Sequence, residues 1–315
     1  MAKNKLLVIG EQDSWDRDAL AEMFEVVDLG GDANPEDWPA DLRNAIEYAT
    51  LKFHRTLDGP FFDLFPNLKI LANFGVGYDA IDVSAASARG IAVTNTPDVL
   101  NADVADLAVM MLLSLLRDAR GAEDWLRDGS WGAKGNYPLR RKMSGQRTGV
   151  LGLGRIGRAI ADRMAAFEND IHYYSRAPKD VPDGWQYHAT PQSLAGSVDF
   201  LIIALSGGPE TAGLVDAATI DALGPTGVLI NISRGTTVDE EALIKALQSK
   251  SIAGAALDVF LNEPNPDPRF LDLDNVVLLP HVASATLETR KDMGALVRKN
   301  LAAALAGDPL PTAVN

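Results

Sequence analysis

The chain has 315 residues, with 29 lysines and arginines against 43 aspartates and glutamates, and it contains no cysteine. This composition excludes disulfides, thiol catalysis and cysteine-based zinc sites, and four scattered histidines do not predict a metal site. The net charge of −14 argues against nucleic-acid and anionic-membrane partners, because phosphate-backbone binding depends on clustered lysine and arginine. With 47% hydrophobic residues, a chain of this length is expected to form two globular domains.

The start of the chain predicts a cytoplasmic protein. Residues 1–10 run from two lysines into a strand-like apolar run, without the long apolar region and small-residue cleavage site of a signal peptide. The most apolar segment, residues 107–116, is shorter than the roughly 20 residues that a membrane helix needs. We therefore expect no membrane span.

The first third of the chain alternates short β-branched or apolar runs with stretches of helical period, the pattern of a parallel α/β sheet. The expected strands are residues 6–9, 26–29, 48–51, 70–74 and 92–95. Residues 98–117 are expected to form one long helix, apolar almost all round, because capping and acidic residues precede a run of good helix formers. Such a helix is buried inside a large domain or lies at a subunit interface.

A second series of α/β units follows a connection rich in glycine, tryptophan and arginine at residues 129–141. The expected strands are residues 148–151, 171–175, 199–205, 228–232, 253–259 and 276–279, and a final helix covers residues 287–306. Six strands with intervening helices predict a complete dinucleotide-binding sheet.

A glycine-rich loop joins the first of these strands to its helix, with the sequence Gly152-Leu-Gly154-Arg155-Ile156-Gly157. Gly152 is expected to permit the tight turn, Gly154 to let a pyrophosphate approach the backbone, and Gly157 to allow close helix packing. The position between strand and helix is the context that this mechanism requires. The alternative is a plain strand-to-helix turn.

The end of the next strand bears on the choice of dinucleotide. NAD sites usually present an acidic residue there to the ribose 2′-hydroxyl, but this chain has Ser175, Arg176 and Lys179 with no acid before Asp180. A hydroxyl and two cations suit a 2′-phosphate, which predicts NADPH over NADH. The alternative is that both cations are ordinary surface residues.

Three ionisable residues follow the last three predicted strands. Arg234, Glu263 and His281 each come just after the carboxyl end of a strand, where ligands bind in open α/β sheets. Three such residues at successive strand ends, beside a dinucleotide loop, predict a catalytic site.

At this point the sequence resembles the D-isomer-specific 2-hydroxyacid dehydrogenases over nearly its whole length. The shared motifs are Gly75-Val-Gly-Tyr-Asp79, Thr96-Pro97, the glycine loop, Asn231-Ile-Ser-Arg-Gly235, Leu257-Asp-Val-Phe260, Glu263-Pro264 and Pro280-His281. The resemblance implies two Rossmann-like domains. A doubly wound parallel coenzyme domain of six or more strands, residues 99–284, would be inserted in a smaller flavodoxin-like substrate domain, residues 1–98 and 285–315. It also assigns the long helix to a homodimer interface.

Within the family, the cofactor strand and the chain length are similar to those of the glyoxylate/hydroxypyruvate reductases. This implies NADPH-dependent reduction of a small 2-oxo acid, such as glyoxylate, hydroxypyruvate or 2-ketogluconate, to the D-2-hydroxy acid. An NAD-linked dehydrogenase of another substrate and a dinucleotide-sensing protein like the C-terminal-binding-protein corepressors remain alternatives.

Three residues carry the implied chemistry. Arg234 would bind the substrate carboxylate and polarise the adjacent carbonyl. His281 would donate the proton, and Glu263 would orient His281 and favour its charged form.

Further positions carry expected contacts. The backbone amides of Val76 and Gly77 would hold the other side of the carboxylate, and Lys52, Phe53 and His54 could line the substrate pocket, although a lone lysine is more often a surface residue. Besides the glycines, the remaining positions expected to contact the cofactor are Arg155, Ile156, Ser175, Arg176, Lys179, Leu205, Ile232, Asp258 and Ala283. We interpret His172 and His188 as structural.

Overall fold

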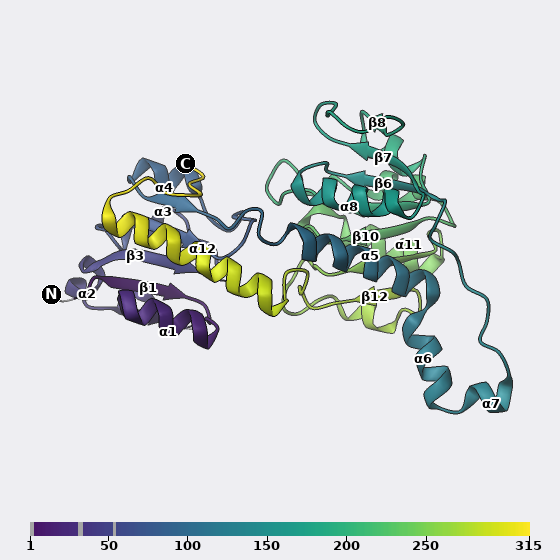
Figure 1. Ribbon diagram of the computed structural model, residues 1–315, viewed down its shortest axis with the longest axis horizontal. Helices are drawn as coiled ribbons and strands as arrows, with labels where there is room; N and C mark the ends of the chain where they lie inside the picture. The colour runs from purple at the N-terminus through teal and green to yellow at the C-terminus, as the bar shows by residue number, and fades with distance from the viewer. Residues whose placement is uncertain (1–2, 31–33, 53–54) are drawn as a thin grey trace. The chain divides into compact units, whose positions relative to one another are not determined.

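The computed structural model describes residues 3–30, 34–52 and 55–315 and divides the chain into two compact α/β units (Figure 1). The first unit combines Met1–Leu100 with Thr286–Asn315, and the second is Asn101–Ala285. The second unit is therefore inserted in the first, in agreement with the predicted fold class. Phe53 and His54 lie outside the described residues.

The first unit contains a five-stranded parallel sheet with the strand order β2-β1-β3-β4-β5. This order is that of flavodoxin-like folds. Every predicted strand of this region is present: β1 (Lys5–Ile9), β2 (Glu25–Leu29), β3 (Ile46–Leu51), β4 (Ile70–Asn73) and β5 (Ala92–Thr94). The inner strands are almost wholly buried, because helices cover both faces of a parallel sheet.

Two helices that are far apart in the sequence lie side by side over one face of this sheet (Figure 1). They are α1 (Ser14–Met23) and α12 (Leu287–Ala306). The buried Asp16 of α1 pairs with Arg298 of α12. Phe61, Phe62 and Ala86 of the shorter helices pack into the core of the sheet. These shorter elements are the 3-10 turn Pro35–Asp37, α2 (Ala40–Asn44), α3 (Gly59–Asp63) and α4 (Val83–Ala88).

The second unit contains a seven-stranded parallel sheet with the order β12-β11-β10-β9-β6-β7-β8. The strand order reverses between β9 and β6, which is the place where dinucleotides bind in such sheets. The strands are β6 (Arg147–Leu151), β7 (Asp170–Tyr174), β8 (Gln186–His188), β9 (Phe200–Ile203), β10 (Val228–Asn231), β11 (Gly254–Leu257) and β12 (Val276–Leu278). Six were predicted. The short, polar edge strand β8 was not, because its three residues carry no apolar run.

Helices cover both faces of this sheet. α5 (Asn101–Arg117) and α8 (Arg155–Ala166) lie side by side on one face (Figure 1). The other face is covered by α9 (Pro191–Ala195), α10 (Ala217–Leu223) and α11 (Glu240–Ser249), whose leucines and isoleucines join the strand core. The remaining elements are α6 (Ala119–Arg127), α7 (Ser130–Lys134) and the 3-10 turns Gly235–Thr237 and Pro268–Asp272.

The two helices singled out in the sequence are both present. α5 starts at Asn101 rather than at the expected residue 98, because Asp98 has a left-handed backbone with φ of 70°. α12 ends at Gly307, whose φ of 75° is the left-handed conformation of a helix C-cap. Within the described residues, no helix is both long enough and apolar enough to span a membrane.

Candidate active site

The three predicted catalytic residues follow three strands that are neighbours in the sheet. Arg234 comes after β10, Glu263 after β11 and His281 after β12, and these strands pair in parallel in that order. Because the carboxyl ends of parallel strands lie at one edge, all three residues belong to the same edge of the second unit.

The structure brings Glu263 and His281 into direct contact. Nδ1 of His281 lies 2.7 Å from Oε2 of Glu263, and Oε1 of the same carboxylate accepts a hydrogen bond from the amide of Phe260 at 2.9 Å. Both side chains are largely shielded from water, with exposed fractions of 33% for His281 and 21% for Glu263. A carboxylate can only accept, so Nδ1 of His281 is the donor of this hydrogen bond.

The backbone of His281 is held in an unusual conformation by Asp258. His281 has a φ of 53°, and its amide donates to the carbonyl of Asp258 at 2.8 Å. The fully buried Asp258 carboxylate accepts the amides of Val282 and Ala283 at 2.8 and 2.9 Å. Burial raises the pKa of Asp258, and these amide bonds partly oppose that rise. Asp258 therefore secures the loop that carries the histidine.

The loop that carries Arg234 is organised by Asn231, the last residue of β10. The Asn231 side chain accepts the amide of Ser233 and donates to the carbonyl of Arg234, both at 3.0 Å. Thr237 Oγ1 donates to that same carbonyl at 2.6 Å. Asn231 opens the motif Asn231-Ile-Ser-Arg-Gly235, which by itself predicted no role for its side chain. An asparagine directly after a buried strand was the available signal.

The Arg234 and Phe260 loops touch through their backbones at Gly235. A Cβ at Gly235 would lie 2.0 Å from the carbonyl carbon of Phe260, so only glycine fits. Since the Phe260 amide binds Glu263, this contact links the loop of the arginine to the loop of the Glu263–His281 pair. These residues fit a site that holds a carboxylate at Arg234 and moves a proton at His281.

The glycine loop has the geometry that a dinucleotide requires. Gly152 has a φ of 104°, and a Cβ there would lie 2.6 Å from the carbonyl oxygen of Ala204. A Cβ at Gly157 would lie 1.9 Å from the carbonyl oxygen of Gly152, so Gly157 lets α8 pack against the strand turn. Gly154 is the N-cap of α8, and a Cβ there would meet nothing within 4 Å. The turn is therefore built for close backbone approach at Gly154, which fits a pyrophosphate on the helix N-terminus.

The loop after β7 exposes the two predicted cations. Ser175 is buried and its hydroxyl donates to the carbonyl of Ala177 at 2.6 Å. Arg176 is 91% exposed and lies 3.7 Å from Glu210, which is 84% exposed, and such a pair contributes little to stability. Lys179 is also exposed, and its amide donates to the hydroxyl of Tyr173. Arg176 and Lys179 are thus accessible to an anionic ligand.

The other predicted cofactor positions lie along the same sheet edge. Leu205 follows β9, and its carbonyl accepts the hydroxyl of Ser233 at 2.5 Å. Ile232 follows β10 and is 8% exposed, as is Ala283 beyond β12. Arg155 and Ile156 form the first turn of α8.

In the first unit, Val76 and Gly77 lie in the turn after β4, at the carboxyl edge of the five-stranded sheet. Lys52 follows β3 at the same edge. The structure excludes the alternative to this prediction, that Lys52 is an ordinary surface lysine. Its side chain is only 10% exposed, its Nζ lies 2.9 Å from Asp13 Oδ2, and it sits over the ring of Phe74 at 5.0 Å from the ring centre.

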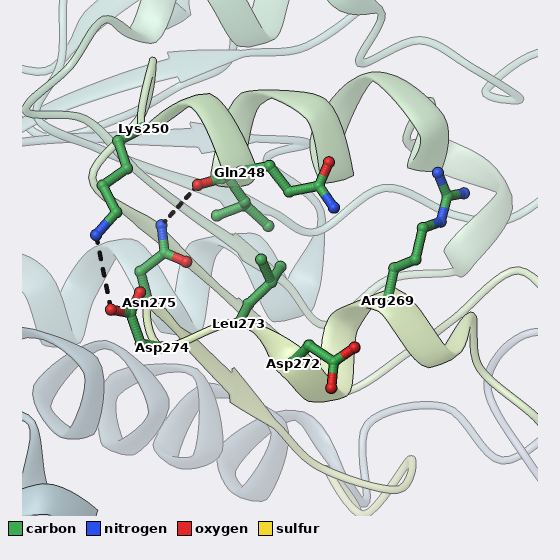
Figure 2. Close-up of a pocket in the computed structure, with 8 residues that line it drawn as sticks. Gln248, Lys250, Arg269, Asp272, Leu273, Asp274 and Asn275 are labelled. Atoms are coloured by element: carbon green, nitrogen blue, oxygen red, sulfur yellow. Dashed lines mark hydrogen bonds and ion pairs between the residues drawn. The ribbon is translucent and has the colours of Figure 1, made fainter.

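A pocket of about 430 Å³ lies elsewhere, at the amino ends of β11 and β12 (Figure 2). Asn275 directly precedes β12 and donates to the carbonyl of Leu247, and Lys250 faces Asp274 at 3.6 Å. The pocket is lined by Leu247, Gln248, Lys250, Arg269, Asp272, Leu273, Asp274 and Asn275. Because the strands are parallel, this pocket is at the sheet edge opposite to Arg234, Glu263 and His281, and it has no part in the candidate site.

The fold and site define a two-domain dinucleotide-binding protein with an Arg-Glu-His set at one sheet edge. The family model described as "D-isomer specific 2-hydroxyacid dehydrogenase, NAD binding domain" matches residues 109–283. The chain is 46% identical over 273 residues to glyoxylate/hydroxypyruvate reductase A of Arabidopsis thaliana, covering 86% of both chains. It is 46% identical over 257 residues to hydroxyphenylpyruvate reductase of Plectranthus scutellarioides, covering 82% of both.

A solved structure of an NADPH-dependent glyoxylate/hydroxypyruvate reductase from Sinorhizobium meliloti, in complex with NADP and malonate, matches with a TM-score of 0.94 and 46% identity. The match covers 99% of this chain and 97% of that one. The protein belongs to the D-isomer-specific 2-hydroxyacid dehydrogenase family and is an NAD(P)-dependent oxidoreductase.

Proposed function

We propose that this protein reduces small 2-oxo acids, with glyoxylate and hydroxypyruvate as the first candidates and 2-ketogluconate as a third, to D-2-hydroxy acids. The observation that carries the proposal is the contact of 2.7 Å between His281 and Glu263 beside the loop of Arg234. Relatives that are 39–46% identical and bear the names glyoxylate, hydroxypyruvate and 2-ketogluconate reductase support the substrate class.

The proposed mechanism assigns one task to each residue. When bound, the reduced nicotinamide supplies a hydride to the carbonyl carbon. Arg234 binds the substrate carboxylate through its guanidinium and stabilises negative charge on the carbonyl oxygen. Val76 and Gly77 are proposed to bind a carboxylate of the substrate through their backbone amides. His281 Nε2 donates the proton that converts the alkoxide to a hydroxyl, and Glu263 holds the imidazole in the orientation and protonation that this needs.

We further propose that NADPH is preferred over NADH. The loop of Ser175, Arg176 and Lys179 presents two exposed cations, and the first acid after β7 is Asp180. Guanidinium groups pair with phosphate oxygens, whereas an acid at this place would repel a 2′-phosphate. Leu205, Ile232 and Ala283 are proposed to contact the rest of the cofactor, and Asp258 to lie at its nicotinamide end.

We also propose that the protein is a homodimer that pairs through α5. This helix exposes apolar side chains, and Met110 is 42% exposed. Val109, Met110 and Leu113 line an apolar groove of about 400 Å³ on its outer face. A monodisperse mass of one chain in light scattering at micromolar concentration would contradict the dimer, and Met110→Asp is expected to dissociate it.

The test of the activity is a substrate panel. The purified protein is mixed with NADPH or NADH and with glyoxylate, hydroxypyruvate or 2-ketogluconate, and oxidation of the cofactor is followed by absorbance. Ranking by kcat/KM is expected to place glyoxylate or hydroxypyruvate with NADPH first. Cofactor binding without turnover of any 2-oxo acid would refute the proposal and favour a dinucleotide sensor. A tenfold preference for NADH would refute the cofactor assignment alone.

A further inference from the structure

Two buried asparagines hold the carbonyl groups of the turn Gly75-Val76-Gly77. Nδ2 of Asn73 donates to the carbonyls of Gly75 and Gly77 at 3.1 and 2.9 Å. Nδ2 of Asn95 donates to the carbonyl of Val76 at 2.9 Å. Asn73 is 7% exposed and Asn95 is 9% exposed. Every carbonyl of the turn is therefore bound by a side-chain amide that is itself buried.

This arrangement orients the amides of the turn. In a trans peptide unit the carbonyl and the following N–H point in opposite directions, and the peptide bonds of this turn are trans. Fixing the carbonyl of Gly75 therefore fixes the N–H of Val76, and fixing the carbonyl of Val76 fixes the N–H of Gly77. Across residues 3–30, 34–52 and 55–315, neither N–H donates to another group. Each N–H therefore points away from the asparagine that binds the preceding carbonyl, that of Val76 away from Asn73 and that of Gly77 away from Asn95.

We propose that Asn73 and Asn95 are positioning residues that aim the amides of Val76 and Gly77 at the substrate carboxylate. This inference rests on the proposed function, in which those two amides bind the carboxylate. Successive backbone N–H groups can form an anion-binding concavity, and donors that are already held in place bind an anion without the cost of ordering the turn.

Asn95 is itself secured by the end of the chain. Thr312 donates through Oγ1 to the backbone carbonyl of Asn95 at 2.6 Å, and the backbone N–H of Asn95 donates to the carbonyl of Thr312 at 3.3 Å. The fully buried Asn300 of α12 binds both Oγ1 and the amide of Thr312, at 2.8 and 3.2 Å. A chain of part-buried hydrogen bonds thus runs from α12 through Thr312 and Asn95 to the glycine turn.

The experiment compares Asn73→Ala and Asn95→Ala with a matched control, Thr50→Val. Thr50 is fully buried in the same sheet, and its hydroxyl donates to the carbonyl of Ala72 rather than to a carbonyl of the turn. The probe is oxalate, titrated against each protein with NADP present. Both asparagine variants are expected to weaken oxalate binding and raise the KM for glyoxylate by about tenfold, with kcat within about twofold of the original. NADPH affinity is expected to stay unchanged.

A merely structural role would lower the melting temperature of all three variants and leave oxalate affinity unchanged, and that result would overturn the proposal. If the asparagine variants do not fold, Thr312→Val decides. This variant keeps the side-chain amides of Asn73 and Asn95 but removes the hydroxyl that holds the Asn95 carbonyl. It is therefore expected to weaken oxalate binding by about threefold. Unchanged oxalate binding would again overturn the proposal. A failure of the proposed reductase activity is distinguished from a failure of this proposal by the two measurements, turnover and oxalate binding. A protein that binds oxalate but reduces no 2-oxo acid would still report on the asparagines.

Discussion

Glu263 binds two partners with its two oxygens, Nδ1 of His281 at 2.7 Å and the amide of Phe260 at 2.9 Å. The carboxylate is therefore anchored to its own loop while it orients the imidazole from the neighbouring strand end. Replacing it with glutamine keeps the shape but exchanges the charged partner of the histidine for a neutral amide, and charge-assisted hydrogen bonds are the stronger ones. We expect Glu263→Gln to lower kcat by about 10²-fold, measured under saturating substrate.

The control for this prediction is Glu241→Gln. Glu241 is exposed on α11 and pairs with Lys245 and Arg269. It is expected to retain full activity, and NADPH affinity should be unchanged in both variants. An active Glu263→Gln enzyme with an unaltered pH–rate profile would contradict the assigned role.

His281→Ala should remove the proton donor while leaving the glycine loop intact. We expect turnover to fall by about 10²- to 10⁴-fold, with NADPH binding measured by fluorescence titration unchanged. Loss of cofactor binding without a turnover defect would show that His281 supports the dinucleotide site instead.

Arg234→Ala is expected to raise KM and lower kcat together, because the guanidinium binds the carboxylate in the ground state and stabilises the carbonyl oxygen in the transition state. The loss in kcat/KM should be about 10²-fold or more. Arg234→Lys should recover only part of it, since an ammonium group cannot form two parallel hydrogen bonds to a carboxylate. Full recovery in the lysine variant would argue for simple charge attraction.

Arg176→Asp should weaken NADPH binding by about tenfold and leave NADH binding nearly unchanged. The control is Lys245→Asp, which changes the charge by the same amount at an exposed position of α11. It should leave the affinity for both cofactors unchanged. Raising the ionic strength should likewise weaken NADPH binding more than NADH binding, because screening acts on the additional phosphate. Equal effects on both cofactors would count against a 2′-phosphate site.

His172 and His188 predict a loss of stability in mild acid. Nδ1 of His172 lies 2.9 Å from Nε2 of His188, and burial lowers the pKa of both, with His188 further lowering that of His172. A histidine whose pKa is lowered by folding binds more protons when unfolded. The stability that the two neutral histidines contribute is therefore fully present above the unfolded histidine pKa of about 6.5. It is lost as the pH falls through their lower pKa in the folded protein.

The measurement is the melting temperature as a function of pH between about 7.5 and 5. His188→Gln should flatten the decline, because one titrating group is removed and the other loses its neighbouring charge. A decline that is equally steep in the variant would assign the pH dependence to other groups.

Much of the fold follows from the sequence pattern, and the exceptions have physical reasons. Strands such as β9 and β10 are continuous apolar runs because both faces are buried, so they are visible in the sequence. β8 is a three-residue edge strand with polar side chains, and only its pairing with β7 makes it a strand. Lys52 could not be recognised as buried, because its partners Asp13 and Phe74 come from distant segments.

The sequence alone determined the family, the two strand series and the catalytic candidates, because these depend on local chemistry: glycines that a turn requires, and charged residues directly after apolar strands. Only the tertiary structure decided how those residues are held. Asp258 binds the loop of His281, Gly235 meets the backbone of Phe260, and Asn95 joins the glycine turn to the end of the chain. Such contacts depend on hydrogen-bond direction and on distances between segments far apart in the chain, which no spacing of residues along the sequence expresses.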